Sequence, residues 1–158
     1  NLNLLIDTII SRCQIIRFKP YSEEELKQLI EKSSDKTIDL VSDSEVLENL
    51  IFISNGSPGK LLEYLKIWNQ IPANIKHEIK FPLKNYENIL LLAKNITTHL
   101  NLKQQEFLLD YIQRNWWKKT KDKKIAEILE AIKININSNI QPRLAWEVGL
   151  LKVKLENS

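Results

Sequence analysis

The sequence is poor in the residues that build turns, disulfides and metal sites. Its 158 residues include three glycines, five prolines, one cysteine, two histidines and no methionine. So few glycines and prolines leave little material for hairpins or glycine-rich loops, and we therefore predict a chain made mostly of helices. A single cysteine excludes an internal disulfide framework and any zinc site with several cysteine ligands. His77 and His99 lack the spacing of a ligand pair, so we expect no metal site.

Targeting segments and catalytic motifs are also missing. No apolar run reaches the roughly 18 residues of a membrane span, and no basic segment precedes an apolar core at the start. We therefore expect a cytoplasmic protein with no membrane partner, and the missing initiator methionine predicts a fragment of a longer chain. No G-x-x-x-x-G-K-[ST], G-x-S-x-G or H-E-x-x-H motif is present. We predict that this fragment is not an enzyme and holds no cofactor.

What the sequence does contain is a series of helix signals, and they start after a short opening segment. Leu4–Ile10 predicts a helical turn or two, and Gln14–Phe18 alternates like a strand. Ser22–Glu25 and Ser42–Glu45 both have the pattern of a capping box, in which two side chains satisfy amides at the start of a helix. The third helix begins at Ser57-Pro58, directly after the glycine that ends the second.

The second half predicts longer helices. Their expected ranges are Asn88–His99, Leu102–Trp117, Lys124–Ile136 and a last helix from Pro142. That last helix keeps Leu144, Val148, Leu151 and Leu155 on one stripe. Short turns between these helices favour antiparallel neighbours and hence a helical bundle. Residues 71–84, framed by two prolines, are expected to be a linker, and we place the domain boundary there.

Three stretches together resemble a known family. They are TIISRCQIIRF (8–18), SNGSPGKLLEYL (54–65) and IQPRLAWEVGLLKV (140–153). They resemble the AAA+ clamp-loader family, and within it the delta-prime subunits of bacterial DNA polymerase III. The resemblance implies that residues 1–19 end an ATPase core, that 20–70 form a three-helix lid and that 85–158 form a helical collar. The implied partners are the other clamp-loader subunits through the collar, and the sliding clamp and primer–template DNA through the assembled ring.

The resemblance also assigns roles to two motifs. Arg12, in the Ser-Arg-Cys motif, would be an arginine finger on the ATP and Mg²⁺ of the neighbouring subunit. A guanidinium suits that role because it stays charged and donates in a planar fork. The alternative is a cation that only complements a helix C-terminus. The second motif is the nucleotide-sensing stretch Gly56, Ser57, Pro58, Gly59, Lys60. Gly59 stands where ATP-hydrolysing relatives have an arginine, which implies a subunit that handles its own nucleotide poorly.

A basic, tryptophan-containing stretch at 114–124 suggests a nucleic-acid surface. The candidate DNA contacts are Arg114, Trp117, Lys118, Lys119 and Lys121, since lysines bind phosphates and aromatic rings stack on bases. The alternative, which we favour, is a solvated helix end with Trp116 or Trp117 buried in the bundle. Two rival functions therefore remain beside the delta-prime role. One is an ATP-hydrolysing clamp-loader subunit of the gamma/tau type, and the other is a helical DNA-binding module centred on 114–124.

Overall fold

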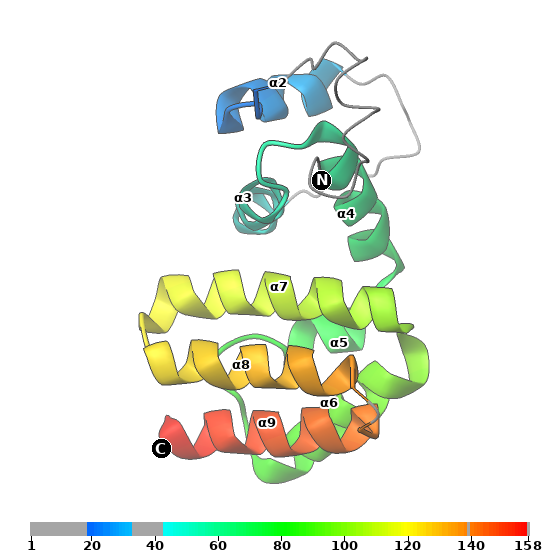
Figure 1. Cartoon of the computed structure of the whole chain (residues 1–158), viewed down its shortest axis with the longest axis vertical. Coiled ribbons are helices and arrows are strands. Elements are labelled where there is room, and N and C mark those ends of the chain that lie inside the picture. The colour runs from blue at the N-terminus through cyan, green and yellow to red at the C-terminus, as the bar shows by residue number, and fades with distance from the viewer. Residues whose placement is uncertain (1–18, 33–42, 139, 158) are drawn as a thin grey trace, which may run out of the picture.

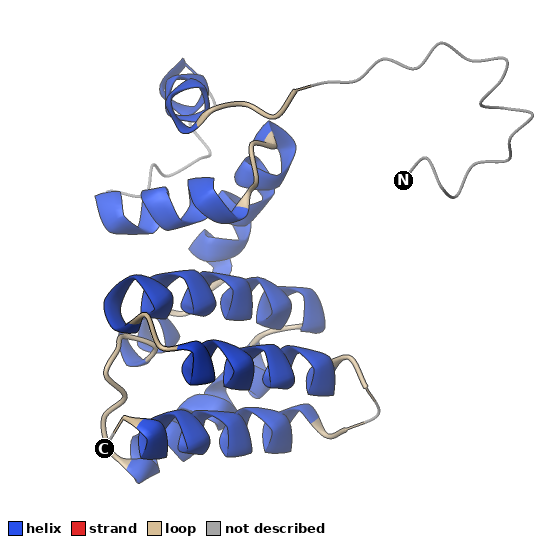
Figure 2. Ribbon diagram, turned by 60° about the vertical axis from the view of Figure 1, so that its left-hand side comes forward, coloured by secondary structure: helices blue, strands red, loops and turns tan. Residues whose placement is uncertain are grey.

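The computed structural model describes residues 19–32, 43–138 and 140–157, and every regular element within them is an α-helix (Figures 1 and 2). These elements are α2 (Glu23–Lys32), α3 (Ser44–Ile53), α4 (Pro58–Gln70), α5 (Ala73–Glu78), α6 (Tyr86–His99), α7 (Leu102–Thr120), α8 (Lys123–Ile136) and α9 (Pro142–Glu156). The predicted all-helical class is confirmed. The expected segments Leu4–Ile10 and Gln14–Phe18 lie outside the described residues.

The helices form a bundle with a smaller group of helices at one end. Helices α7, α8 and α9 lie side by side in one layer, and α6 packs behind α9 (Figure 1). Helices α2, α3 and α4 are stacked beyond α7, which α3 and α4 both contact. One continuous cluster of buried apolar side chains runs through both groups. Helix α7 therefore connects the expected lid helices to the rest of the bundle.

Side-chain caps explain where several helices begin. In the predicted box at Ser22–Glu25, the Ser22 amide donates to Glu25 Oε2 at 2.7 Å and the Glu25 amide donates to Ser22 Oγ at 3.3 Å. The box predicted from Ser42 to Glu45 is wrong. Helix α3 instead begins at Ser44, because the Asp43 carboxylate accepts the Glu45 amide at 3.0 Å. Aspartate is as good an N-cap as serine. The adjacent residues Ser42 and Asp43 therefore do not fix the first residue of α3 from the sequence alone.

The stretch expected as a linker contains a helix. Helix α5 lies within 71–84, and Ile71, Ile75, Ile79 and Leu83 recur there at every fourth position. All four side chains are buried in the common core. The apolar spacing is helical, whereas Pro72 and Pro82 within the stretch favour breaks in a helix. The division of the chain into lid, linker and collar stays a prediction.

Most of the apolar stripe of the last helix faces outward, whereas Leu151 packs against the core. Leu144, Val148 and Leu155 are 51%, 43% and 64% exposed. The side of α9 that enters the core is instead formed by Ala145, Trp146, Gly149, Leu150 and Val153. At Gly149 a β-carbon would collide with the Ile132 side chain of α8. A glycine at this position allows α8 and α9 to pack closely, which orients the remaining face of α9 toward solvent.

Candidate functional site

The nucleotide-sensing stretch is a tight turn between α3 and α4. Asn55 and Gly56 have positive φ angles of 50° and 71°. A β-carbon on Gly56 would lie 2.7 Å from the Tyr21 carbonyl oxygen, and the Tyr21 amide donates to the Gly56 carbonyl at 2.9 Å. Ser57 then caps α4 by accepting the Lys60 amide at 3.4 Å. Gly56 is therefore required by the backbone.

Gly59 is different, because nothing in the fold requires a glycine there. It is exposed in the first turn of α4, and no described atom lies within 4 Å of a β-carbon built on it. Lys60, the next residue, is also exposed. A β-carbon at position 59 would meet no steric conflict within the part of the chain that the structure describes. Packing among the described residues therefore does not require a glycine at position 59.

Four residues in the α7 part of the basic stretch 114–124 contact α3. Lys118 Nζ lies 3.2 Å from Glu48 Oε2, and Lys119 Nζ lies 3.7 Å from Glu45 Oε1. The Asn115 amide group donates to Glu45 Oε1 at 2.8 Å. Arg114 places its guanidinium 3.4 Å from the centre of the Phe52 ring. Helix α3 therefore meets a row of polar and cationic groups along one side of α7.

The two adjacent tryptophans have different surroundings. Trp116 is 1% exposed, and its indole N–H donates to the Ile79 carbonyl at 2.9 Å. Its ring also packs on Phe81, with 5.4 Å between ring centres. Trp117 is 38% exposed. Lys121, beyond the end of α7, is exposed and has a positive φ of 55°. The structure thus buries one tryptophan and leaves the other, with Lys121, at the surface.

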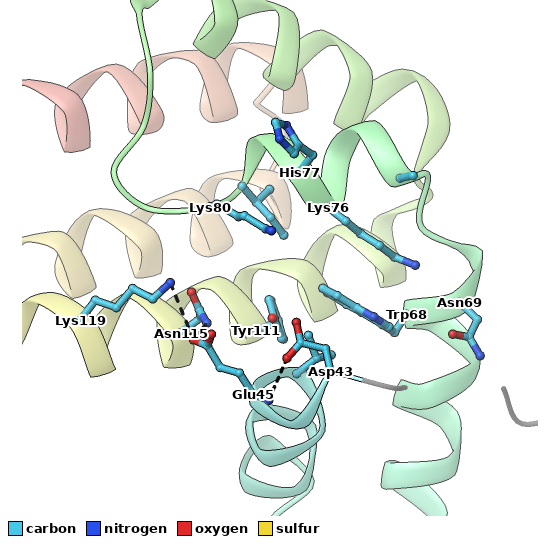
Figure 3. A pocket seen from close by; sticks show the side chains of 13 residues that line it. Asp43, Glu45, Trp68, Asn69, Lys76, His77, Lys80, Tyr111, Asn115 and Lys119 are labelled. Carbon is cyan, nitrogen blue, oxygen red and sulfur yellow. Dashed lines mark hydrogen bonds and ion pairs between the residues drawn. The ribbon is translucent and has the colours of Figure 1, made fainter. Parts of the chain in front are cut away.

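A cavity of about 680 Å³ lies where α3 and α4 meet α5 and α7. Asp43 and Glu45 lie on its α3 side, while Lys76 and Lys80 approach from the α5 side (Figure 3). The rings of Trp68 and Tyr111 form part of its lining, with their centres 4.4 Å apart. Burial raises the pKa of Tyr111 to about 12, so its hydroxyl stays protonated at neutral pH. Nothing in the sequence pattern placed α5 beside α3, so we did not predict this cavity.

A second, apolar depression of about 330 Å³ lies between α8 and α9. Its apolar lining includes Ile128, Ile140, Leu144 and Val148, and we call it the α8–α9 groove. The groove follows from the close packing at Gly149, which brings the two helices together and leaves their outer apolar side chains side by side. Sequence analysis found the α9 stripe, but the stripe alone did not show that it faces solvent.

Three further expectations concern Arg12, a metal site and a membrane span. Arg12 and its motif lie outside the described residues, so the arginine finger stays a prediction. The described residues contain no cluster of His, Cys, Asp and Glu that could hold a metal ion. Among the helices of the described part, none is both long and apolar enough to cross a membrane.

Comparison with known proteins gives one match. The family model described as "Cyanobacterial DNA polymerase III delta prime, C-terminal domain" matches residues 24–153. No curated protein and no solved structure matches the chain. The matched range includes the turn before α4, the contact between α3 and α7, and the α8–α9 groove. It covers most of the chain and confirms the resemblance to delta-prime subunits. The chain therefore belongs to the family of DNA polymerase III delta-prime C-terminal domains, and its role is in the clamp loader.

Proposed function

We propose that this chain joins delta-prime to a neighbouring clamp-loader subunit through the α8–α9 groove. The observation that carries the proposal is the outward apolar face of α9. Leu144 and Val148 are about half exposed, and Ile140, at 42%, lies next to them in the same groove. Soluble proteins rarely leave large contiguous apolar patches open to water, and such patches mark interaction sites. Because the family belongs to a multi-subunit complex, the expected partner is another subunit of that complex.

The shape of the groove favours an amphipathic helix from that partner. Helices commonly insert apolar side chains, spaced one turn apart, into a groove between two other helices. Leu144 and Val148 lie one turn apart along α9, and both line the groove. Lys152 on the rim would contact the polar side of the incoming helix. Because Glu127 lines the groove as well as Lys152, the proposed partner face combines an apolar stripe with flanking charges of both signs.

The rest of the proposal concerns nucleotide. In the complete subunit, Arg12 would act in trans on the ATP and Mg²⁺ of the neighbouring subunit, while this fragment itself would bind no cofactor. Two findings support a role of the delta-prime type over the gamma/tau type. The family match names delta prime, and position 59 lacks the arginine although a β-carbon there would meet no described atom within 4 Å. The sliding clamp and primer–template DNA would be reached through the assembled ring.

The test is assembly with the partner subunits. A variant combining Leu144→Asp and Val148→Asp introduces two charges into the groove at exposed positions, so the bundle should still fold. We expect its affinity for the partner subunits to fall by about 30-fold or more, because losing a central interface contact commonly costs about 2 kcal/mol. Binding would be measured by size-exclusion chromatography and mass photometry of the mixed subunits.

The matched control is Leu91→Asp on α6. Leu91 is 55% exposed and apolar, but it does not line the groove. Its variant should assemble like the unmodified chain. Equal assembly by the groove variant and the unmodified chain, with both folded, would refute the proposal.

A further inference from the structure

A third depression, of about 470 Å³, lies where the end of α3 meets α7 and α8, and we call it the Arg114 pocket. Its two aromatic side chains are Phe52 and Trp117, which are 45% and 38% exposed. Phe52 belongs to α3, whereas Arg114 and Trp117 are three residues apart on α7 and so share one side of that helix. Helices α3 and α8 lie on opposite sides of α7 (Figure 1). The pocket therefore extends over α7 from one neighbouring helix to the other and exposes aromatic surface.

The charges in this pocket leave one cation without a partner. Of the described residues that line it, three are charged, and two of these, Asp110 and Lys133, form an ion pair with 2.5 Å between Oδ1 and Nζ. The third, Arg114, forms no ion pair with any carboxylate of the described residues. Its guanidinium instead lies over the Phe52 ring, 3.4 Å from the ring centre. The unpaired charge in the pocket is therefore that of Arg114.

Arg114 also lacks a hydrogen-bond acceptor. Its Nε atom is buried and has no acceptor among the described residues, although the side chain as a whole is only half-buried. Phe52 covers one face of the guanidinium and keeps water from it. A charged donor that loses water without gaining an acceptor costs free energy, and a ligand that supplies an acceptor recovers part of it. A carboxylate matches best, because it can accept two parallel hydrogen bonds from the planar guanidinium.

We propose that the Arg114 pocket binds an acidic segment of a partner protein, in which a glutamate or aspartate lies next to an aromatic or aliphatic side chain. The carboxylate pairs with Arg114, and the apolar side chain packs on the exposed rings of Phe52 and Trp117. Arginine and aromatic side chains are enriched at protein interfaces and among the residues that contribute most to binding. The volume of about 470 Å³ lies in the range of sites that enclose small ligands, which suits one or two side chains of a partner.

The charges favour a protein segment over a strand of nucleic acid. A strand binds along a row of cations that contact successive phosphates. Lys118 and Lys119, the next cations along α7, are paired with Glu48 and Glu45 of α3, and neither lysine lines the pocket. The Asp110 carboxylate within the lining would repel a second phosphate. One unpaired cation beside two exposed rings instead matches a single carboxylate with an apolar neighbour.

The experiment titrates the isotope-labelled full chain with the peptide Gly-Ser-Glu-Phe-Glu-Leu-Ser-Gly and follows the indole N–H signals by nuclear magnetic resonance. The signal of Trp117, identified by its loss in Trp117→Ala, reports on the pocket. The signals of Trp116 and Trp146, which are buried, serve as internal references. We expect a saturable shift of the Trp117 signal alone. Peptides with glutamine in place of both glutamates, or with serine in place of phenylalanine and leucine, should bind about tenfold more weakly.

The test variant is Arg114→Gln, which removes the unpaired charge. Its matched control is Arg143→Gln, which removes the other arginine of the described residues from α9, where it is paired with Glu147. We expect Arg114→Gln to weaken binding of the peptide about tenfold, and Arg114→Lys to restore only part of it, because lysine lacks the planar fork. Arg143→Gln should bind like the unmodified chain. Circular dichroism would establish that each variant folds.

Three results would overturn the site: unchanged binding by Arg114→Gln, equal losses in Arg114→Gln and Arg143→Gln, or no saturable shift of the Trp117 signal at millimolar peptide. Tighter binding of oligo(dT) than of the peptide, read from the same signal, would assign the pocket to nucleic acid and overturn the acidic ligand. The lining of the pocket shares no residue with the α8–α9 groove. The variant with Leu144→Asp and Val148→Asp should therefore bind the peptide unchanged, and this proposal and the proposed function can fail independently.

Discussion

Replacing Trp116 with alanine should be among the most destabilising single changes in the described part of the chain. The side chain is 1% exposed, so nearly all of its surface leaves water on folding. A buried aromatic side chain removes about 150–250 Å² from water, which at about 25 cal/mol per Å² amounts to roughly 4–6 kcal/mol. This is an upper bound, since the unfolded chain already buries some surface. Measured truncations of buried tryptophan and phenylalanine cost about 3–5 kcal/mol, and we expect this range for Trp116→Ala.

The indole N–H contributes separately. It donates to the Ile79 carbonyl at 2.9 Å, which ties the end of α5 to α7. Trp116→Phe keeps a ring in the core but removes this donor, and we expect it to cost about 1–3 kcal/mol. The phenylalanine variant also keeps the prediction testable if the alanine variant does not fold, because small domains have only about 5–15 kcal/mol of stability in total.

The assay is urea unfolding at equilibrium, followed by far-ultraviolet circular dichroism and extrapolated linearly to water. Circular dichroism is preferable to fluorescence because the chain has four tryptophans. The matched control is Trp117→Ala, which removes the same side chain from a position that is 38% exposed. We expect the control to cost about 1 kcal/mol. Equal costs for the two alanine variants, or a cost below about 1 kcal/mol for Trp116→Ala, would refute the assignment of Trp116 to the core.

Three further predictions test the turn, the cavity and the motif beyond the described residues. Gly56→Ala should destabilise the chain by more than the roughly 1–2 kcal/mol of its positive φ, because its β-carbon would also lie 2.7 Å from the Tyr21 carbonyl oxygen. Gly59→Arg should be neutral or stabilising by up to about 1 kcal/mol in the same urea assay. The stability associated with Tyr111 should be fully present below pH 10 and decline as the pH rises toward 12, because its pKa rises to about 12 on folding. This decline, about 2–3 kcal/mol at most, should be absent in Tyr111→Phe when both are unfolded across that pH range. Arg12→Ala in the complete subunit should leave ring assembly intact but slow DNA-stimulated ATP hydrolysis and clamp loading, and unchanged rates would contradict the arginine finger. At the affected site the loss should approach the ~10³–10⁵ that such residues contribute in other nucleotide hydrolases, with a smaller effect on the ring as a whole.

The sequence by itself determined most of the described helices and many of their ends. Caps such as Ser22 and Ser57 act through hydrogen bonds to amides two or three residues away, so local sequence is enough to place them. The same is true of the turn at Asn55-Gly56, where positive φ angles need those residue types. The capping box at Ser42 failed by one residue because Asp43 competes for the same amides. Helix α5 was missed even though Ile71, Ile75 and Ile79 repeat at helical spacing within and beside it.

Only the tertiary structure decided which faces are buried and which charges meet. The stripe of α9 has the spacing of a core face, but the close approach at Gly149 turns the other side of the helix inward. Lys118 and Lys119 belong to the basic stretch that suggests a nucleic-acid surface. In the folded chain, however, they pair with carboxylates of α3, some 70 residues earlier in the sequence. Lys76 meets the Trp68 ring only because α4 and α5 pack together, which the sequence does not show. Burial and charge pairing depend on contacts between distant segments, and such contacts exist only once the helices have packed.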